Sequence, residues 1–291
     1  MNFDSLCKFN SAFSKVFNNK LILITGGSSG IGLALARELI NYDAKLVIIS
    51  HHPEKLFEAQ KKLTAAGGDV TAFECDISDM AQVTRLKQQV LQIGVPDMII
   101  NNAGYSSYRT FEDTPLMEIE HLVAVNLNGA LRVTHAFLKE MILRKSGRII
   151  NVSSVTATMM IVPHSIYHAC KAGMLAWTRG LAIELKPFQI KVQAICPGRV
   201  QTDFFKHPSF IERLPRRETA ISTPMRTIIY QILQGIANNT QVIYTPRIYR
   251  YISWALSTFA WILEPIYFPL LRNRIKTYYL YKKESRSNIT N

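Results

Sequence analysis

The sequence predicts an α/β fold in which helices cover both faces of a parallel sheet. Short aliphatic and β-branched runs alternate along the chain with longer segments whose apolar residues recur at helical spacing. Such alternation is typical of parallel strands joined by crossover helices. The glycine-rich and polar motifs fall at or just after predicted strand ends, where doubly wound sheets bind ligands. At 291 residues, the chain fits one such domain with an appendage.

The first unit, residues 21–40, joins a buried strand to a helix through a glycine-rich turn. Residues 21–24 are continuously aliphatic, and from Ile31 the apolar residues follow one face of a helix. The turn between them has the spacing TGxxxGxG. A helix start offers unpaired N–H groups to a phosphate, and glycine lets the backbone approach it closely. The turn therefore predicts a pyrophosphate site, with an ordinary strand-to-helix turn as the alternative for the glycines alone.

The later elements continue the alternation. Further strands are predicted at 45–50, 70–74, 96–104, 147–154, 190–198 and 240–248. Helices are predicted at 54–66, 80–93, 116–126 continuing to 143, and 165–185. The polar, proline-containing segment 201–225 interrupts this order and has the composition of a flap over a substrate site.

Cysteine usage and the N-terminus bear on the compartment. Cys7, Cys75, Cys170 and Cys196 have no CxxC or metal-ligand spacing, so we expect no metal, no disulfide framework and a reduced intracellular compartment. Residues 1–19 lack the sustained apolar run of a signal peptide. Their spaced phenylalanines fit a short amphipathic helix packed on the domain.

Positive charge is concentrated in the C-terminal part of the chain. Residues 206–291 hold 13 Lys and Arg against four Glu and no Asp, and the whole chain has a formal net charge of +13. A basic region indicates a nucleic acid or a membrane as partner. A Trp- and Tyr-rich apolar segment accompanies this charge, and no zinc-finger, RRM or KH signature does. We therefore expect a membrane surface and no nucleic acid.

A tyrosine and a lysine lie four residues apart in the predicted helix 165–185. Tyr167 and Lys171 therefore project from one face. A phenol with a pKa of about 10 is a poor acid or base at neutral pH, but a neighbouring ammonium group favours the phenolate and lowers that pKa. The pair is thus a candidate acid/base unit, although this spacing alone is more often an ordinary helix face. Ser153 and Ser154 end the preceding strand, where a hydroxyl could polarise a carbonyl.

Five motifs in this order resemble the short-chain dehydrogenase/reductase family. They are TGGSSGIG (25–32), NNAG (101–104), the serine-ended strand 147–154, YHACK (167–171) and PGRVQT (197–202). The resemblance covers residues 20–202. It implies one Rossmann-type doubly wound domain, hydride transfer between a nicotinamide cofactor and a carbonyl or alcohol, and a homodimer as a common assembly. We divide the chain into an N-terminal segment (1–19), a catalytic domain (20–247) and a hydrophobic, then basic, helical extension (248–291).

The resemblance implies four catalytic positions. Tyr167 corresponds to the acid/base, and Lys171 would lower its pKa and bind the nicotinamide ribose. Ser154 matches the serine that orients the substrate oxygen, with Ser153 as the alternative. Asn126 corresponds to the asparagine that holds a water linked to the lysine.

The resemblance also implies a cofactor site along several strand ends. Its residues are Gly26, Ser28, Gly30, Ile31 and Gly32 around the pyrophosphate turn, Ser50 and His51 after the second strand, Asp76 and Ile77 after the third, Asn102, Ala103 and Gly104 along the adenosine side, Tyr167 and Lys171 at the ribose, and Pro197, Gly198, Val200 and Thr202 at the nicotinamide end.

The end of the second strand bears on the choice of cofactor. NAD sites usually carry an acidic residue there to accept from the ribose 2′-hydroxyl, whereas this chain has Ser50 and His51. A 2′-phosphate therefore meets no negative charge, and Ser28, Ser50, His51 and Lys55 could receive it. NADP(H) is favoured, and NAD(H) is the alternative.

The extension contains a long apolar segment. Residues 251–271 include no basic residue, and their length is close to the roughly 20 residues that span a bilayer. Glu264, Pro265 and Pro269 are expected to break the helix, and the Trp/Tyr content with flanking arginines fits a membrane interface. A helix packed on the domain or on a partner subunit is the alternative. The GGSSGIG loop and the extension are weakly similar to long-chain keto-lipid (3-ketodihydrosphingosine-type) reductases.

These observations predict an NADP(H)-dependent oxidoreductase of an apolar, lipid-like carbonyl or alcohol, cytoplasmic and peripheral on a membrane. An NAD-dependent dehydrogenase of a soluble hydroxy compound is one alternative. A non-catalytic nucleotide-binding membrane scaffold is another, and the intact set Ser154, Tyr167 and Lys171 argues against it.

Overall fold

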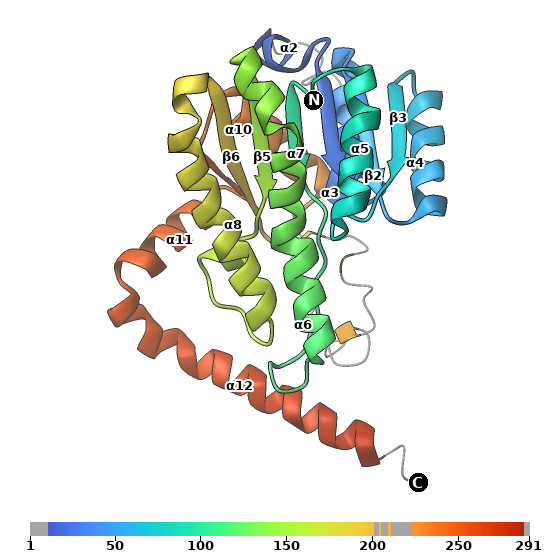
Figure 1. The fold of residues 1–291 in the computed structure, drawn as a ribbon. Helices are drawn as coiled ribbons and strands as arrows, with labels where there is room; N and C mark the ends of the chain where they lie inside the picture. The colour runs from blue at the N-terminus through green and yellow to red at the C-terminus, as the bar shows by residue number, and fades with distance from the viewer. Residues whose placement is uncertain (1–10, 201–203, 205–208, 211–222, 288–291) are drawn as a thin grey trace.

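The computed structural model describes residues 11–200, 204, 209–210 and 223–287, and it confirms the predicted doubly wound sheet. Seven parallel strands lie in the order β3-β2-β1-β4-β5-β6-β7 (Figure 1). The strands are β1 (Leu21–Thr25), β2 (Lys45–Ser50), β3 (Asp69–Glu74), β4 (Met98–Asn101), β5 (Gly147–Val152), β6 (Ile190–Pro197) and β7 (Val242–Thr245). The order reverses between β1 and β4, which pair directly. At such a switch point a ligand crevice opens beyond the carboxyl ends of the strands.

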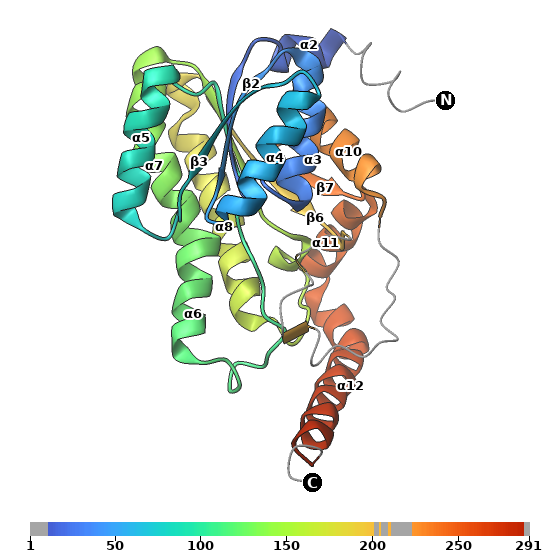
Figure 2. The ribbon, with the colours of Figure 1, turned by 90° about the vertical axis from the view of Figure 1, so that its right-hand side faces the viewer.

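Helices pack on both faces of the sheet, as Figure 2 shows from the side. One face carries α3 (Gly30–Leu39), α4 (Pro53–Ala65) and α10 (Met225–Ala237), and the other carries α5 (Met80–Ile93), α7 (Gly129–Arg144) and α8 (Ser165–Glu184). Side chains of β1 alternate between the two layers: Ile22 and Ile24 join the first, Leu21 and Leu23 the second. A strand buried on both faces is apolar throughout, which explains the continuous aliphatic runs.

Local signals set several element bounds. The Asp79 carboxylate accepts from the N–H groups of Ala81 and Gln82, so α5 begins at the predicted residue. Pro53 occupies the first turn of α4, where its missing N–H removes no intrahelical bond. Short turns complete the domain at η1 (Ile40–Tyr42), η3 (Val155–Ala157) and η4 (Lys186–Phe188). The apolar helix α10 was not predicted from the sequence.

The N-terminal segment packs on the domain. In α2 (Ser11–Phe17), Phe13 and Phe17 are buried, with ring centroids 6.2 and 5.8 Å from that of Tyr42. The spaced phenylalanines thus form the apolar face of a short helix, as predicted. Residues 1–10 and most of the predicted flap lie outside the described residues.

The C-terminal extension forms two helices, α11 (Ile248–Thr258) and α12 (Ala260–Ser287). The helix direction bends by 110° between them. In Figure 1, α12 crosses below α8 and α6 (Leu116–Val123), and Figure 2 shows that it lies apart from α6. The prediction that prolines break the helix is wrong, because Pro265 and Pro269 both lie inside α12 and the break falls at Phe259. Each proline removes one N–H donor, while the turns on either side continue the helix. In the described chain no single helix is long and apolar enough to cross a membrane, but α11 and α12 meet that criterion together as a bent pair.

Candidate active site

The turn between β1 and α3 forms one end of the site. Gly26 and Gly30 have φ angles of +64° and +54°, in the region that favours glycine. The Ser29 side chain does not cap α3, so the first N–H groups of the helix are available to bind an anion. Gly32 has a different role from the one expected. A Cβ at Gly32 would lie 2.4 Å from the Gly26 carbonyl oxygen, so this glycine allows α3 to pack on the turn and does not line the cavity.

The TG and NNAG motifs are bonded to each other across the switch point. The Thr25 hydroxyl accepts from the N–H groups of Asn102 and Ala103, each at 3.0 Å. The Asn102 amide donates to the carbonyl oxygens of Thr25 and Gly26 at 3.0 and 3.1 Å. These four bonds fix the glycine turn against the end of β4, which is the bracing role expected for the NNAG motif.

The end of β2 presents hydroxyl and imidazole groups. The Ser28 hydroxyl donates to Ser50 Oγ at 2.9 Å, and Ser50 Oγ accepts from the His52 N–H at 3.1 Å. Burial, followed by the neighbouring His52, lowers the pKa of His51, which is therefore neutral at physiological pH. Lys55, on the first turns of α4, lines the same part of the cavity and is the cation there. The positive charge next to Ser50 thus comes from Lys55 and not from His51.

The end of β3 contributes a carboxylate to the cavity. Asp76 Oδ1 accepts from the backbone N–H and the hydroxyl of Ser78, at 2.8 and 2.7 Å. Ile77 lines the cavity beside it. The two residues expected to bind the cofactor after the third strand therefore both line the cavity.

Tyr167 and Lys171 project from α8 into the cavity, as their spacing predicts. The Lys171 ammonium lies 5.5 Å from the Tyr167 ring centroid and donates to the Val152 carbonyl at 2.9 Å. Ser154, just after β5, forms a hydrogen bond with Tyr167. Ser153 instead donates to the Lys171 carbonyl at 2.8 Å. The geometry thus pairs Ser154, rather than Ser153, with the phenol.

Burial controls the protonation of this pair. It raises the pKa of Tyr167 above its ordinary value, although the hydrogen bond with Ser154 acts in the opposite direction. Burial also lowers the pKa of Lys171 to about 8. The ammonium was expected to lower the pKa of Tyr167; in the protein alone this pKa is raised instead, because burial removes water from around the phenol. Tyr167 is a proton donor at neutral pH, which is the form that carbonyl reduction requires.

Asn126 lies behind Gly104, in the π-helical turn η2 (Ala124–Asn128) that joins α6 to α7. Its amide donates to the carbonyl oxygens of Tyr105 and Leu122 at 2.9 and 3.0 Å. Its Oδ1 is buried and has no hydrogen-bond partner among the described residues. A Cβ at Gly104 would lie 2.6 Å from this oxygen and 3.4 Å from Lys171 Nζ. Asn126 therefore does not line the main cavity, but its oxygen and the Lys171 ammonium face the same small space, which suits the expected link through water.

The end of β6 closes the opposite side. Pro197, Gly198 and Val200 line the cavity, and Thr202 lies outside the described residues. A Cβ at Gly198 would lie 2.4 Å from the ring of Tyr249 in α11. Glycine here thus allows the extension to pack directly on the expected nicotinamide end.

All these strand ends border one cavity of about 1130 Å³. The predicted residues that line it are Gly26, Ser28, Gly30, Ile31, Ser50, His51, Asp76, Ile77, Asn102, Ala103, Gly104, Ser154, Tyr167, Lys171, Pro197, Gly198 and Val200. The backbone cradle at α3, the cation at Lys55 and the buried ammonium at Lys171 fit a nicotinamide dinucleotide.

The other end of the cavity has an aromatic and apolar wall that the motifs did not predict. It includes Tyr105, Tyr108, Met159, Ile161, Phe204 and Phe210. The Phe204 and Tyr167 ring centroids are 5.6 Å apart, so this wall reaches the catalytic tyrosine. Phe204 and Phe210 belong to the segment 201–225 that was predicted to be a flap over the substrate site. For the other residues of the wall, the sequence gives no signal beyond their place after strand ends.

Helix α12 returns to this wall. Arg274 lines the cavity, with its guanidinium carbon 5.7 Å from the Tyr108 ring centroid. Tyr278 is buried, and its hydroxyl donates to Asp113 at 2.7 Å. Burial and the Arg274 charge lower the pKa of His164 to about 4, so the imidazole in this wall is neutral. The extension is therefore part of the wall of the site.

Comparison with known proteins identifies the family. The family model described as short chain dehydrogenase matches residues 20–209. The chain is 32% identical over 222 residues to the ketoacyl reductase HetN of Nostoc sp. (strain PCC 7120), covering 76% of each protein. It is 31% identical over 211 residues to a fatty acyl-CoA reductase of Acinetobacter baylyi, covering 72% of each. The chain belongs to the short-chain dehydrogenase/reductase family.

Solved structures agree with this assignment. A short-chain dehydrogenase/reductase of Burkholderia phymatum in complex with NAD superposes with a TM-score of 0.77 at 22% identity, over 84% of this chain and 94% of that one. A variant of actinorhodin polyketide ketoreductase with NADPH gives a TM-score of 0.71 at 27% identity, over 78% and 95%. As a family member, the chain is an oxidoreductase that acts on a carbonyl or alcohol with a nicotinamide cofactor.

Proposed function

We propose that this enzyme uses NADP(H) to reduce the carbonyl group of apolar, lipid-like substrates at a membrane surface. One observation carries the proposal: a single cavity joins the pyrophosphate turn, the set Ser154, Tyr167 and Lys171, and an aromatic and apolar wall. The relatives named as ketoacyl and fatty acyl-CoA reductases support a substrate of the acyl type.

In the proposed reduction, Tyr167 gives its phenolic proton to the substrate oxygen as negative charge develops there. Ser154 donates a hydrogen bond to the same oxygen and holds the carbonyl in position. The bound cofactor supplies the hydride that the carbonyl carbon accepts. The Lys171 ammonium then stabilises the phenolate left on Tyr167 and would bind the cofactor ribose.

The direct test is NADPH oxidation with a β-keto thioester of N-acetylcysteamine as substrate, together with tryptophan-fluorescence titrations of both cofactors. We expect turnover and tighter binding of NADPH than of NADH. Tighter binding of NADH with oxidation of a soluble hydroxy compound would instead identify an NAD-dependent dehydrogenase. Binding without turnover of any carbonyl or alcohol would leave the scaffold alternative.

The reduction rate is expected to fall at high pH. The pKa of Lys171 is about 8, so as the pH rises through this value the ammonium loses its charge and no longer stabilises the phenolate. We therefore expect kcat/KM for reduction to be constant below this pH and to decline above it, and a pH profile with saturating NADPH measures this. In Lys171→Arg the guanidinium stays charged, so the decline in kcat/KM at high pH should disappear even if the rate is lower. If the decline persists in Lys171→Arg, it is caused by the titration of another group.

The Ser50 position is expected to control the choice of cofactor. A carboxylate in Ser50→Asp would repel a 2′-phosphate and accept from a 2′-hydroxyl. We expect the Kd for NADPH to rise at least tenfold, while the Kd for NADH stays the same or falls, both measured by fluorescence titration. Ser50→Ala is the matched control, because it removes the hydroxyl without adding charge: it should weaken NADPH binding by only a few-fold, through the lost contact with the 2′-phosphate, and leave NADH binding nearly unchanged. An equal loss of affinity for NADPH and NADH in Ser50→Asp would contradict the role of Ser50 in the choice of cofactor.

The extension supports the membrane part of the proposal. Ile262, Ile266 and Leu270 form a stripe along α12 at four-residue spacing, with exposed fractions of 44%, 67% and 69%. Tyr251 and Trp254 are likewise exposed on α11, at 65% and 60%. The exposed basic residues beside these side chains are Arg250, Arg272 and Lys276. Exposed apolar and aromatic residues flanked by cations suit the interface of an anionic bilayer.

Binding to vesicles tests this surface. In Ile262→Gln/Leu270→Gln the apolar stripe is interrupted, so flotation with vesicles of phosphatidylcholine and phosphatidylserine should show at least tenfold weaker binding than the parent. Leu143→Gln/Ile183→Gln is the matched control, since those leucine and isoleucine side chains are 73% and 75% exposed on α7 and α8. Equal flotation of the stripe variant and the parent would contradict the membrane assignment.

A further inference from the structure

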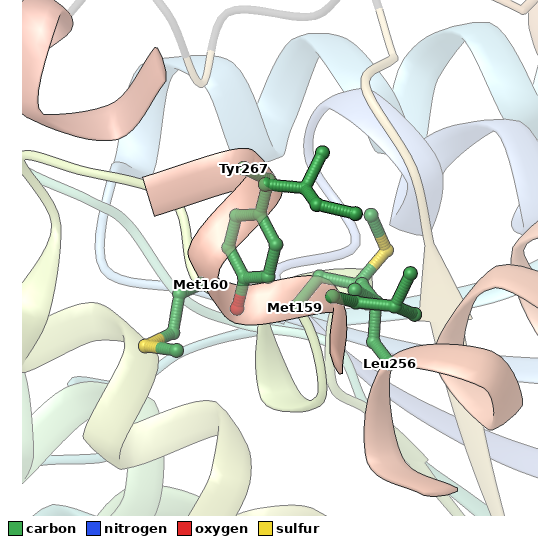
Figure 3. A pocket seen from close by; sticks show the side chains of 6 residues that line it. Met159, Met160, Leu256 and Tyr267 are labelled. Atoms are coloured by element: carbon green, nitrogen blue, oxygen red, sulfur yellow. The ribbon is translucent and has the colours of Figure 1, made fainter. Parts of the chain in front are cut away.

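A second cavity, of about 270 Å³, lies between the loop after η3 and the bend joining α11 to α12. Figure 3 shows Met159, Met160, Leu256 and Tyr267 directed toward this space from the loop and from both helices. Leu263 and Ile266 complete its lining. Its walls are therefore almost entirely hydrocarbon and thioether, with one phenol.

This cavity adjoins the catalytic one. Met159 lines both cavities, so its flexible side chain lies between the apolar space and the cavity that contains Tyr167. The loop that carries Met159 is held against α11, because the Thr158 hydroxyl lies 2.8 Å from the hydroxyl of Ser253, which is buried. The bend of the extension is thus held against the catalytic loops.

The same cavity also reaches the outer surface of the bend. Ile266 lines it and is nevertheless 67% exposed. Apolar side chains therefore follow one another from the exposed stripe of α12, through the second cavity, to Met159 at the edge of the catalytic cavity, and they mark out an apolar path. A methionine at the junction suits such a path, because its unbranched side chain adapts readily to different shapes.

We propose that this path holds the straight alkyl chain of the carbonyl substrate, which enters from the membrane side of the α11–α12 bend while its carbonyl group reaches Tyr167. This inference rests on the proposed function. It specifies a carbonyl substrate with a straight alkyl chain and the subsite that holds this alkyl chain. A polar ligand would lose its hydrogen bonds in these walls, whereas each methylene buried there gains about fourfold in affinity.

Kinetics along a homologous series tests the path. The substrates are short-, medium- and long-chain β-keto thioesters of N-acetylcysteamine, below their micelle-forming concentrations and without vesicles. For the parent, kcat/KM should rise with chain length. Leu263→Trp fills the cavity, and it should lower the ratio of long-chain to short-chain kcat/KM at least tenfold. Leu280→Trp is the matched control, because Leu280 is 62% exposed on α12 outside both cavities and outside the apolar stripe, so this variant should keep the parent ratio.

Photo-crosslinking gives a second measurement that needs neither a variant nor turnover. The probe is a long-chain β-keto thioester with a terminal diazirine, and we expect it to label peptides containing Met159 and Met160 or residues 256–267. Labelling elsewhere, or an unchanged chain-length ratio in folded Leu263→Trp, would overturn the path while leaving the reductase proposal intact. Labelling at the bend without reduction of any thioester would overturn the reductase proposal instead. If the probe does not label the bend and no thioester is reduced, both proposals are overturned.

Discussion

Replacing Tyr167 with phenylalanine is expected to lower kcat for carbonyl reduction by about 100- to 10,000-fold. The substitution removes the proton donor and its hydrogen bond with Ser154, and it keeps the ring that packs 5.6 Å from Phe204. The affinity for NADPH should stay within a few-fold, because the glycine turn and Lys171 are unchanged. Single-turnover assays and fluorescence titration measure the two quantities separately.

Tyr251→Phe is the control for this prediction. Tyr251 is 65% exposed on α11, so its variant loses a hydroxyl without touching the cavity. A Tyr167→Phe enzyme that reduces its substrate as fast as the parent would rule out Tyr167 as the acid. The scaffold alternative, in which the chain binds a nucleotide without turnover, instead predicts no carbonyl reduction by either the parent or the variant.

Replacing Gly32 with alanine is expected to weaken cofactor binding by about 10- to 100-fold and to lower the melting temperature. The new Cβ would lie 2.4 Å from the Gly26 carbonyl oxygen and 2.6 Å from Asn102 Nδ2. The start of α3 would have to move away from the turn, and overpacking of this kind costs about 1–3 kcal/mol. The turn that is expected to bind pyrophosphate would lose its shape, although Gly32 itself does not line the cavity.

Gly180→Ala is the matched control for Gly32→Ala. Gly180 is exposed within α8, and a Cβ there would meet nothing within 4 Å. Alanine at an open helix position stabilises by about 0.5–1 kcal/mol. Calorimetry should therefore show a lower melting temperature for Gly32→Ala and a higher one for Gly180→Ala. A Gly32→Ala protein with normal NADPH affinity would show that α3 and the turn can separate without loss of the site.

The sequence predicted the parallel sheet because its signals are local and strong. The buried strands are apolar on both faces, Asp79 caps α5 where the helix was expected to begin, and the glycines require a sharp turn after β1. The catalytic set was equally accessible, since a four-residue spacing on a helix fixes the relative direction of Tyr167 and Lys171.

Other features depend on contacts between distant segments. The Asn101 amide donates to Asn151 at 2.8 Å, and Asn151 donates to Thr178 at 2.9 Å, which links β4, β5 and α8 beneath the site. No spacing along the chain predicts such a network. The same holds for Arg274 and Tyr278, because only the path of α12 after the bend returns them to the cavity. The raised pKa of Tyr167 was missed for a related reason, since burial of a phenol is a property of the assembled fold.

The attachment of α12 has a thermodynamic consequence. This helix borders the substrate cavity through Arg274, is tied to Asp113 through Tyr278, and exposes its apolar stripe on the outside. One rigid element would therefore contact both the substrate and the lipid. If lipid contact tightens substrate binding by some factor, occupation of the cavity must tighten lipid association by the same factor, because the coupling free energy is reciprocal. Substrate supply would then set how long each enzyme molecule stays on the membrane.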